Sequence, residues 1–358
     1  MTPRLGVQIA PWRRCDELVE LGRRMSDVLD IVWVQDQMLA RNVYVILAAL
    51  AQAGCGVGTN VTYPFGRNPI EMASAAATLS ELVSDDREMA VGFGTGGALV
   101  TSLFRKERPV RVAREAITLM RSLWTGQAVE LDRFPQLGAS LGYRPGAVAQ
   151  LTYPVERPPA IVVAGVGPKI LRVAGQLADG LICPSNLPTT SMPAFKSGRF
   201  DELSGLGTAR AARPADAPPL RLVFGINVSV SADREQARSY ARRQLALVVG
   251  NPRLWPDLEA VGLDVESAGE VKVAFEAGQG VDGAAARVSD SLSDSLIVSG
   301  TPEECIGPMV ELRDLATAHG YGEFYIGAPL GPDPLEAAEL LRNQLIPQLW
   351  PERAAAVR

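Results

Sequence analysis

Three polar side chains follow an apolar run near the beginning of this chain, at a place where chemistry is expected. Residues 32–34 read Val-Trp-Val and suit a buried strand, and Gln35, Asp36 and Gln37 follow directly. In α/β proteins, ligands bind beyond the carboxyl ends of parallel strands. A carboxylate there can transfer a proton, whereas a primary amide can only donate and accept hydrogen bonds. These residues therefore predict one edge of a ligand pocket.

A second candidate is the glycine-containing turn in "VVAGVGPKILRVAG", residues 162–175. An apolar run ends at Ala164, Gly165 and Gly167 bracket Val166, and a proline opens the next helix. Free backbone N–H groups at a helix N-terminus attract anions, and a lysine in the first turn adds positive charge. The spacing fits a phosphate site and fits equally a tight turn without a ligand.

Two further stretches carry polar or glycine residues after an apolar run. "GVGTNVTYPFGRNP", residues 56–69, places Thr59 and Asn60 at a strand end, where hydroxyl and amide groups can hold a flat heterocycle. A capped helix explains its last residues and leaves Arg67 unexplained. "VGFGTGG", residues 91–97, permits close approach of the backbone to a planar ligand and equally suits a tight turn.

Composition narrows the class of protein. The formal charge of −5 comes from 40 acidic and 35 basic residues without a basic stripe, which argues against nucleic acid as a partner. No apolar run is long enough for a membrane span, so we expect a cytoplasmic protein. Metal binding is not expected, because the cysteines are scattered and His319, the one histidine, precedes a glycine at a helix end that it would cap. The cysteines are Cys15, Cys55, Cys183 and Cys305.

Short apolar runs alternate with amphipathic segments along the chain. Strands are expected at 5–10, 31–34, 55–61, 89–93, 160–164, 180–183, 222–228 and 323–326, and "SLIVSG" at 295–300 suits a further short strand. Helices are expected at 16–25, 69–83, 110–124 and 232–249. The absence of G-x-G-x-x-G after the first strand favours a (β/α)8 TIM barrel over a doubly wound sheet. We expect one domain, residues 1–358, with insertions at about 127–153, 187–219 and 251–288.

Together these stretches resemble the luciferase-like flavin and deazaflavin barrel superfamily. Within it they are most similar to the coenzyme F420-dependent methylenetetrahydromethanopterin reductases. The resemblance runs nearly end to end through "LGVQIAP", "VWVQDQMLARNVY", "GTNVTYPFGRNP", "VGFGTGG", "VAGVGPKILRVAGQLADG", "VSGTPEE" and "GAPLGPD". It does not extend to residues 187–220.

The resemblance implies a cofactor site at the C-terminal mouth of the barrel. Ala164, Gly165, Val166 and Gly167 match the segment that holds the cofactor phosphate, and Asp36 matches a strand-end acid near the ring. Thr59, Asn60 and Val61 match a bulged third strand behind the ring, with a non-prolyl cis peptide at or next to Asn60–Val61. Gly94 and Thr95 match a loop on the other side of the ring.

Two departures from the family pattern remove its acid–base groups. Gln37 replaces the usual histidine, and Gln8 stands where the tetrahydropterin reductases carry a glutamate as proton donor. With Asp36, these are the candidate catalytic residues. The resemblance thus implies an oxidoreductase that transfers hydride from reduced F420 to a cyclic imine, an iminium or a pterin-like substrate.

The sequence leaves the function and the oligomeric state open. An FMN-dependent monooxygenase, a flavin-free methylenetetrahydrofolate reductase that uses NADH, and a non-catalytic cofactor-binding paralogue are alternatives. The family also implies a homodimer or homotetramer.

Overall fold

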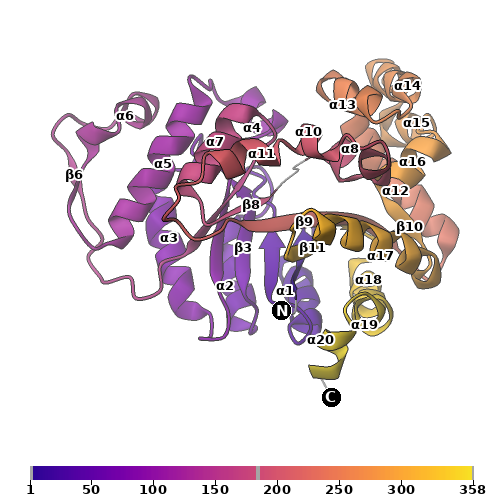
Figure 1. Ribbon diagram of the computed structural model, residues 1–358, viewed down its shortest axis with the longest axis horizontal. Coiled ribbons are helices and arrows are strands. Elements are labelled where there is room, and N and C mark those ends of the chain that lie inside the picture. The colour runs from indigo at the N-terminus through magenta and orange to yellow at the C-terminus, as the bar shows by residue number, and fades with distance from the viewer. Residues whose placement is uncertain (1–2, 183–185, 357–358) are drawn as a thin grey trace.

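The computed structural model describes residues 3–182 and 186–356 and contains a closed barrel of parallel strands (Figure 1). Around the ring the order is β1, β2, β3, β4, β7, β8, β9 and β11, and pairing of β11 with β1 closes it. The bounds are β1 Arg4–Ile9, β2 Ile31–Val34, β3 Val57–Thr62, β4 Met89–Phe93, β7 Ala160–Ala164, β8 Gly180–Ile182, β9 Arg221–Val230 and β11 Glu323–Leu330. The prediction of a (β/α)8 barrel is confirmed.

The strands predicted at 31–34, 89–93 and 160–164 coincide with β2, β4 and β7. The further short strand is β10, Val298–Gly300, which pairs with the C-terminal part of β9 outside the ring. β9 and β11 are longer than predicted, because they continue to pair with each other, and β9 also pairs with β10. Of the strand predicted at 180–183, Cys183 lies outside the described residues.

The four helices with predicted bounds begin and end within two residues of them: α1 Cys15–Met25, α3 Pro69–Leu82, α5 Pro109–Trp124 and α12 Arg234–Val249. The other helices around the barrel are α2 Val43–Gln52, α4 Ala98–Leu103, α7 Pro168–Leu177, α17 Pro302–Ala318, α18 Pro334–Leu340, α19 Ile346–Leu349 and α20 Pro351–Ala356. Asn68 caps α3 and Asp333 caps α18, each by accepting a backbone N–H. Proline at the first helical position fixes φ where no N–H partner is needed, so these helices start sharply.

Each of the three segments predicted to be insertions contains helices or strands. Residues 127–153 contain β5 Val129–Glu130, α6 Pro135–Leu141 and β6 Val148–Ala149. Residues 187–219 contain α8 Leu187–Thr190, α9 Met192–Lys196, α10 Phe200–Ser204 and α11 Leu206–Ala211. Residues 251–288 contain α13 Trp255–Ala260, α14 Val265–Glu276 and α15 Gly280–Ala285, which gather with α12 and α16 Asp290–Leu296 at one end of the molecule (Figure 1).

The helical group at that end has its own apolar core. Leu245 of α12, Leu258 of α13, Val271 of α14 and Leu292 of α16 are fully buried in a cluster separate from the barrel core. Burial of such side chains stabilises a fold by about 1.5–3 kcal/mol each. The sequence suggested helical character here without indicating a second core.

Charged residues close the N-terminal end of the barrel. Arg221, at the start of β9, donates to Glu323 of β11 at 2.6 Å and to Glu88, just before β4, at 2.8 Å. Burial lowers the pKa of Arg221, but the two carboxylates outweigh this effect and raise it overall. Salt bridges at the N-terminal face of a barrel contribute to stability, whereas ligands bind at the C-terminal face.

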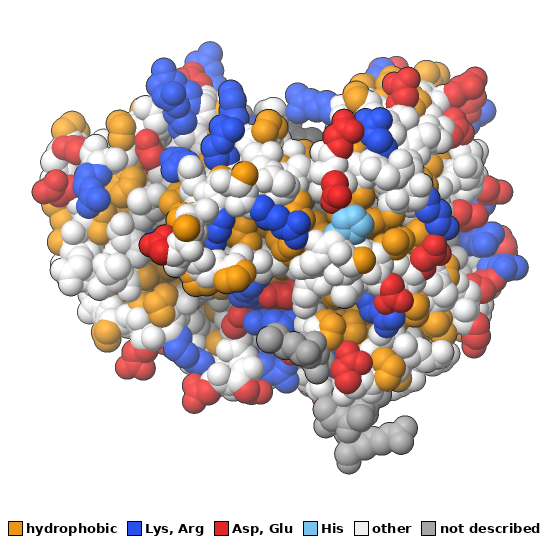
Figure 2. All heavy atoms as spheres, viewed as in Figure 1, with side chains coloured by type: hydrophobic (Ala, Val, Ile, Leu, Met, Phe, Trp, Pro, Cys, Tyr) orange, Lys and Arg blue, Asp and Glu red, His pale blue; other side chains and the backbone are white. Residues whose placement is uncertain are grey.

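His319 is the C-terminal cap of α17, as predicted, and lies at the molecular surface (Figure 2). Its Nδ1 is 2.9 Å from the carbonyl oxygen of Leu315, and its ring stacks edge-on against Phe195 and Phe200. It does not line the cavity described below. The structure therefore assigns it a capping and packing role.

Candidate functional site

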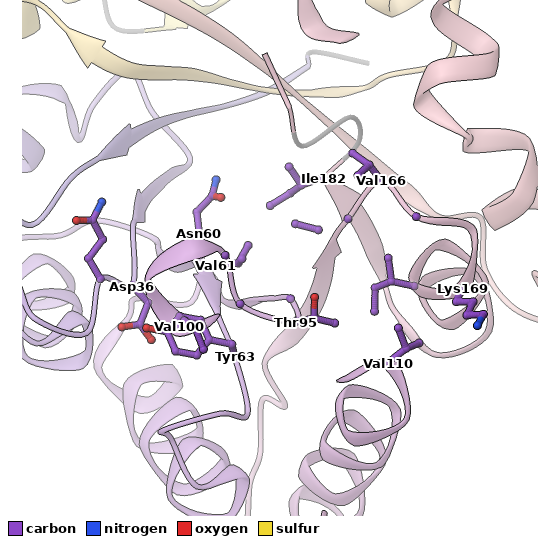
Figure 3. Close-up of a pocket in the computed structure, with 18 of the residues that line it drawn as sticks. Asp36, Asn60, Val61, Tyr63, Thr95, Val100, Val110, Val166, Lys169 and Ile182 are labelled. Carbon is purple, nitrogen blue, oxygen red and sulfur yellow. The ribbon is translucent and has the colours of Figure 1, made fainter. Parts of the chain in front are cut away.

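A cavity of about 980 Å³ opens at the C-terminal ends of the strands. It is lined by every residue predicted for the site except Thr59, together with seven charged, aromatic or aliphatic neighbours and three residues of adjoining turns. These additional residues are Tyr63, Gly96, Gly97, Val100, Val110, Pro168, Lys169, Ile170, Ile182 and Tyr325. Figure 3 shows Asp36 on one side of this space and Lys169 on the other, with Asn60, Val61 and Thr95 between them.

β3 forms a bulged wall of the cavity. The Asn60–Val61 peptide is cis, which confirms the prediction, and the pairing of β3 with β4 shifts register between Thr59 and Thr62. Thr59 is fully buried behind this wall, where its hydroxyl donates to the carbonyl of Gly92 at 2.8 Å. Thr59 thus holds the bulge against β4, and its side chain does not reach the cavity.

Asn60 presents a polar atom without a partner. Its Nδ2 is buried and donates no hydrogen bond to any described residue, although the side chain lines the cavity. Burial of an unpaired amide donor costs about 1–3 kcal/mol, so the position favours a ligand that accepts this bond. Tyr325, from β11, lines the same region, and burial raises the pKa of its phenol to about 12.

Asp36 is held by a partner that the sequence left unexplained. Its side chain is fully buried, and Arg67 binds both carboxylate oxygens, at 2.6 Å through Nε and 2.8 Å through Nη2. Thr62 donates a third bond at 2.7 Å. Burial lowers the pKa of Arg67, but the hydrogen bonds and charge of Asp36 outweigh it and raise the pKa overall. The carboxylate is therefore a neutralised, anchored group.

Amide side chains form a continuous row along the first two strands. Gln35 donates to Gln8 at 3.2 Å, and Gln37 donates to Gln35 at 2.8 Å. The indole N–H of Trp12 donates to Gln37 at 2.6 Å. Gln8 and Gln37 were predicted as site residues, whereas the roles of Gln35 and Trp12 were missed. The available signal for Gln35 was an amide directly after β2, two residues beyond Trp33, which pairs with Gln8 on the neighbouring strand.

The residues of the turn after β7, Ala164 to Pro168, line the cavity. α7 begins at Pro168 after Gly167, which caps it without a side-chain hydrogen bond. The first N–H groups of a helix have no intrahelical acceptor, and the helix dipole makes this end positive. Lys169 adds a charge in the first turn and lines the cavity. This geometry suits a phosphate.

The loop after β4 is tied down by a lysine. Lys106 donates to the carbonyl of Gly96 at 2.7 Å and of Thr95 at 3.3 Å. Burial, and to a smaller extent the charge of Arg253, lower the pKa of this ammonium group. Gly94 packs within van der Waals reach of Val61, since a Cβ on it would lie 3.1 Å from that side chain. The loop therefore lies close against the bulge.

Two kinds of feature were not found among the described residues. In the part of the chain that the structure describes, no group of three or more His, Cys, Asp or Glu side chains is arranged to hold a metal ion. Within the same residues, no helix is long and apolar enough to cross a membrane.

Comparison with known proteins agrees with this geometry. Residues 3–319 match the luciferase-like monooxygenase family. The chain is 30% identical over 356 residues to a 5,10-methylenetetrahydromethanopterin reductase of Archaeoglobus fulgidus, covering 97% of this chain and 99% of the relative. It is 29% identical to an F420-dependent glucose-6-phosphate dehydrogenase of Amycolatopsis mediterranei, over 85% of this chain and 86% of the relative.

A solved structure shares the fold. The coenzyme F420-dependent tetrahydromethanopterin reductase of Methanopyrus kandleri superposes with a TM-score of 0.74 at 21% identity, covering 98% of this chain and 100% of that one. The family match spans most of the chain, from the first strand of the barrel to the end of α17. The chain belongs to the luciferase-like monooxygenase family.

Proposed function

We propose that this protein is an oxidoreductase that transfers hydride from reduced coenzyme F420 to a cyclic imine, an iminium or a pterin-like small molecule. The observation that carries the proposal is the cavity itself, which is lined both by the turn before α7 and by the bulged β3. One of the relatives named above, the glucose-6-phosphate dehydrogenase of Amycolatopsis mediterranei, is F420-dependent by name and is matched over 86% of its length. A volume of about 980 Å³ is at the upper end for ligand sites and suits a cofactor with a second small molecule.

The residues of the cavity fit a deazaflavin cofactor. The turn of Ala164, Gly165, Val166 and Gly167 offers N–H groups for its phosphate, and Asn60 offers an unpaired donor for its ring. Gly94 and Thr95 would cover the ring opposite Val61. When bound, F420 supplies the hydride, and the protein supplies position and electrostatics.

The side chains around the cavity provide little acid–base chemistry near neutral pH. Gln8 and Gln37 do not titrate, and Asp36 has both oxygens bound by Arg67. An acceptor that is already cationic takes hydride without a proton, so an iminium suits this site best. Hydride transfer in single turnovers should therefore vary little between about pH 6 and 8. A steep bell-shaped profile in that range would contradict the assignment.

Separate titrations of the purified protein with F420, FMN and NADH test the cofactor. Micromolar binding of F420 alone supports the proposal. Selective binding of FMN favours a monooxygenase, selective binding of NADH favours a flavin-free methylenetetrahydrofolate reductase, and binding without turnover of any offered imine favours a non-catalytic paralogue. Binding of none of the three compounds would refute the proposal.

The wider setting belongs to the same proposal. We infer one functional domain over residues 1–358, a homodimer or homotetramer, and action in the cytoplasm on a small molecule, without nucleic acid or membrane as a partner. Solution scattering and sedimentation of the full chain test the oligomeric state.

A further inference from the structure

The row of side-chain hydrogen bonds along β1 and β2 has one direction. Trp12 donates to Gln37 at 2.6 Å, Gln37 donates to Gln35 at 2.8 Å, and Gln35 donates to Gln8 at 3.2 Å. The row begins at the molecular surface, where Trp12 is 50% exposed, and ends in the cavity that Gln8 lines.

The direction follows from the chemistry of the first member. An indole has a donor and no acceptor, so the atom of Gln37 that faces Trp12 must be the carbonyl oxygen. The NH2 group of Gln37 then faces Gln35, whose carbonyl must receive it, and the NH2 group of Gln35 faces Gln8 in turn. Each amide is thereby oriented by its predecessor, and none of the three is free to turn over without loss of a bond.

The last member is left with a donor. The carbonyl oxygen of Gln8 accepts from Gln35, and no described residue accepts a hydrogen bond from its Nε2. Nε2 of Gln8 is not fully buried, so it is open to the cavity that the side chain lines. Gln8 therefore offers an N–H donor at a defined place on the β1 side of the site.

We propose that Trp12, Gln37 and Gln35 are positioning residues that fix the Gln8 amide with its NH2 group toward the cavity, where it selects a ligand bearing a hydrogen-bond acceptor such as a carbonyl oxygen or an unprotonated ring nitrogen. That this ligand is the substrate rests on the proposed function; the orientation of the amides does not. A neutral amide donates at every pH, whereas a carboxyl group in its place would donate only when protonated.

The orientation can be tested without any cofactor by placing a titrating probe at the end of the row. In the variant Gln8→Glu, the N–H of Gln35 should stabilise the carboxylate, so its pKa should be lower than in Gln8→Glu/Gln35→Leu. Asp36 with its partner Arg67, and Lys169, Tyr63 and Tyr325 of the cavity lining, are the same in both variants, so their effects cancel in the comparison. Titration by carbon NMR of labelled glutamate measures both values.

The opposite sign would overturn the proposal. If the carbonyl of Gln35 faced residue 8, it would favour the protonated acid, and removal of Gln35 would lower the pKa of the new glutamate. Gln8→Glu/Trp12→Phe extends the test to the start of the row, because loss of the indole donor allows the amides to turn over. The pKa should again rise relative to Gln8→Glu, and an unchanged value would refute the role of Trp12.

A pair of probe ligands of nearly equal shape tests the donor itself. We would measure binding of 1-indanone, which has a carbonyl, and indane, which has none, to the cofactor-free full chain by NMR. Gln8→Met removes the donor at similar volume and should reduce the preference for 1-indanone by about three- to tenfold, the range for one hydrogen bond. Gln52→Met, a matched change on the exposed face of α2, is the control and should leave the preference unchanged.

An unchanged preference in Gln8→Met would overturn the proposed donor role. Neither experiment uses F420, so failure of F420 to bind would refute the proposed function and leave these results standing. Conversely, a lost preference with intact F420 binding would place Gln8 on the substrate side of the cavity.

Discussion

At the scale of single residues, the ion pair of Arg67 and Asp36 stabilises the fold beside the cavity. The Asp36 side chain is fully buried, and Arg67 supplies two of its three hydrogen bonds. Removal of one partner leaves the other charge buried and unpaired, which costs about 3–5 kcal/mol. We therefore expect Arg67→Met to lower the free energy of unfolding by about that amount, measured by chemical denaturation.

Arg14→Met is the matched control for this variant. Arg14 also forms a close ion pair, with Asp16 at 3.0 Å, but both side chains are well exposed. Exposed pairs contribute little, so its unfolding curve should overlay that of the wild type. Equal curves for Arg67→Met and Arg14→Met would show that Asp36 finds another partner or is uncharged.

Strand-end residues of the site could be predicted from the sequence, because parallel strands bring their carboxyl ends to one face wherever they stand in the chain. Their partners could not. Arg67 follows Asp36 by 31 positions, and Trp12 precedes Gln37 by 25, and no local pattern pairs residues over such distances. The assignment of Thr59 to the third strand was possible, but the side of the strand that its hydroxyl faces depends on the bulge.

At the scale of elements, the turn before α7 gives a direct test of phosphate binding. Gly167 has extended backbone angles, and a Cβ there meets no atom within 4 Å, so valine fits without strain. We expect Gly167→Val to weaken F420 binding by about tenfold, equivalent to 1.4 kcal/mol, with an unchanged melting temperature. Fluorescence titration and thermal unfolding measure the two quantities.

Gly165 would be the wrong position for that test. A Cβ there would lie 2.4 Å from the side chain of Ile170, so Gly165→Val should lower the melting temperature. Weaker binding in that variant could then result from disturbed packing and would not test the phosphate site. From the sequence alone, a bulky β-branched residue at Gly165 was expected to leave the fold intact, and the position of Ile170 contradicts that expectation. Unchanged affinity in Gly167→Val would place the phosphate elsewhere.

Helix caps give a second prediction at this scale. Three helix starts share one sequence pattern, a capping side chain, a proline and a glutamate three residues after the cap: "NPIE" at 68–71, "TPEE" at 301–304 and "DPLE" at 333–336. The glutamate reaches back to the capping residue only in the second, where Glu304 accepts from the N–H of Thr301 at 3.0 Å. In the third, Glu336 instead accepts from Ala232 at 3.1 Å, and Asp333 alone caps α18. Local sequence predicts the start of a helix, while tertiary neighbours decide where its side chains bond.

Asp333 receives the N–H groups of Leu335 at 2.9 Å and Glu336 at 3.2 Å. Loss of such a cap costs about 1 kcal/mol, so Asp333→Ala should lower the free energy of unfolding by about that amount. Asp216→Ala, in the exposed loop before β9, is the control and should have no effect. If the unfolding curve of Asp333→Ala matched that of the control, water or Glu336 would have to accept the N–H groups that Asp333 accepts in the wild type.

At the scale of the whole molecule, the barrel separates stability from function. The charged floor of Arg221, Glu88 and Glu323 closes the N-terminal end, and the cavity occupies the other. Periodicity predicted this ring, because buried parallel strands read as short apolar runs. Periodicity could not predict the separate core around α12. The apolar faces of its helices form a core only by packing against helices that are distant in the sequence.

Buried tyrosines make the stability of the whole fold sensitive to alkali. Burial raises the pKa of Tyr63, Tyr143 and Tyr325 to about 12 each, from the ordinary value of 10.0. A group whose folded pKa is raised contributes stability that is fully present below its unfolded pKa and is lost as pH rises through the folded value. The free energy of unfolding should therefore fall between about pH 10 and 12, as urea unfolding at stepped pH would show. Tyr325→Phe should flatten this dependence, whereas Tyr240→Phe on α12 should not. Equal slopes in the two variants would mean that the Tyr325 phenol ionises as readily in the folded chain as in the unfolded one.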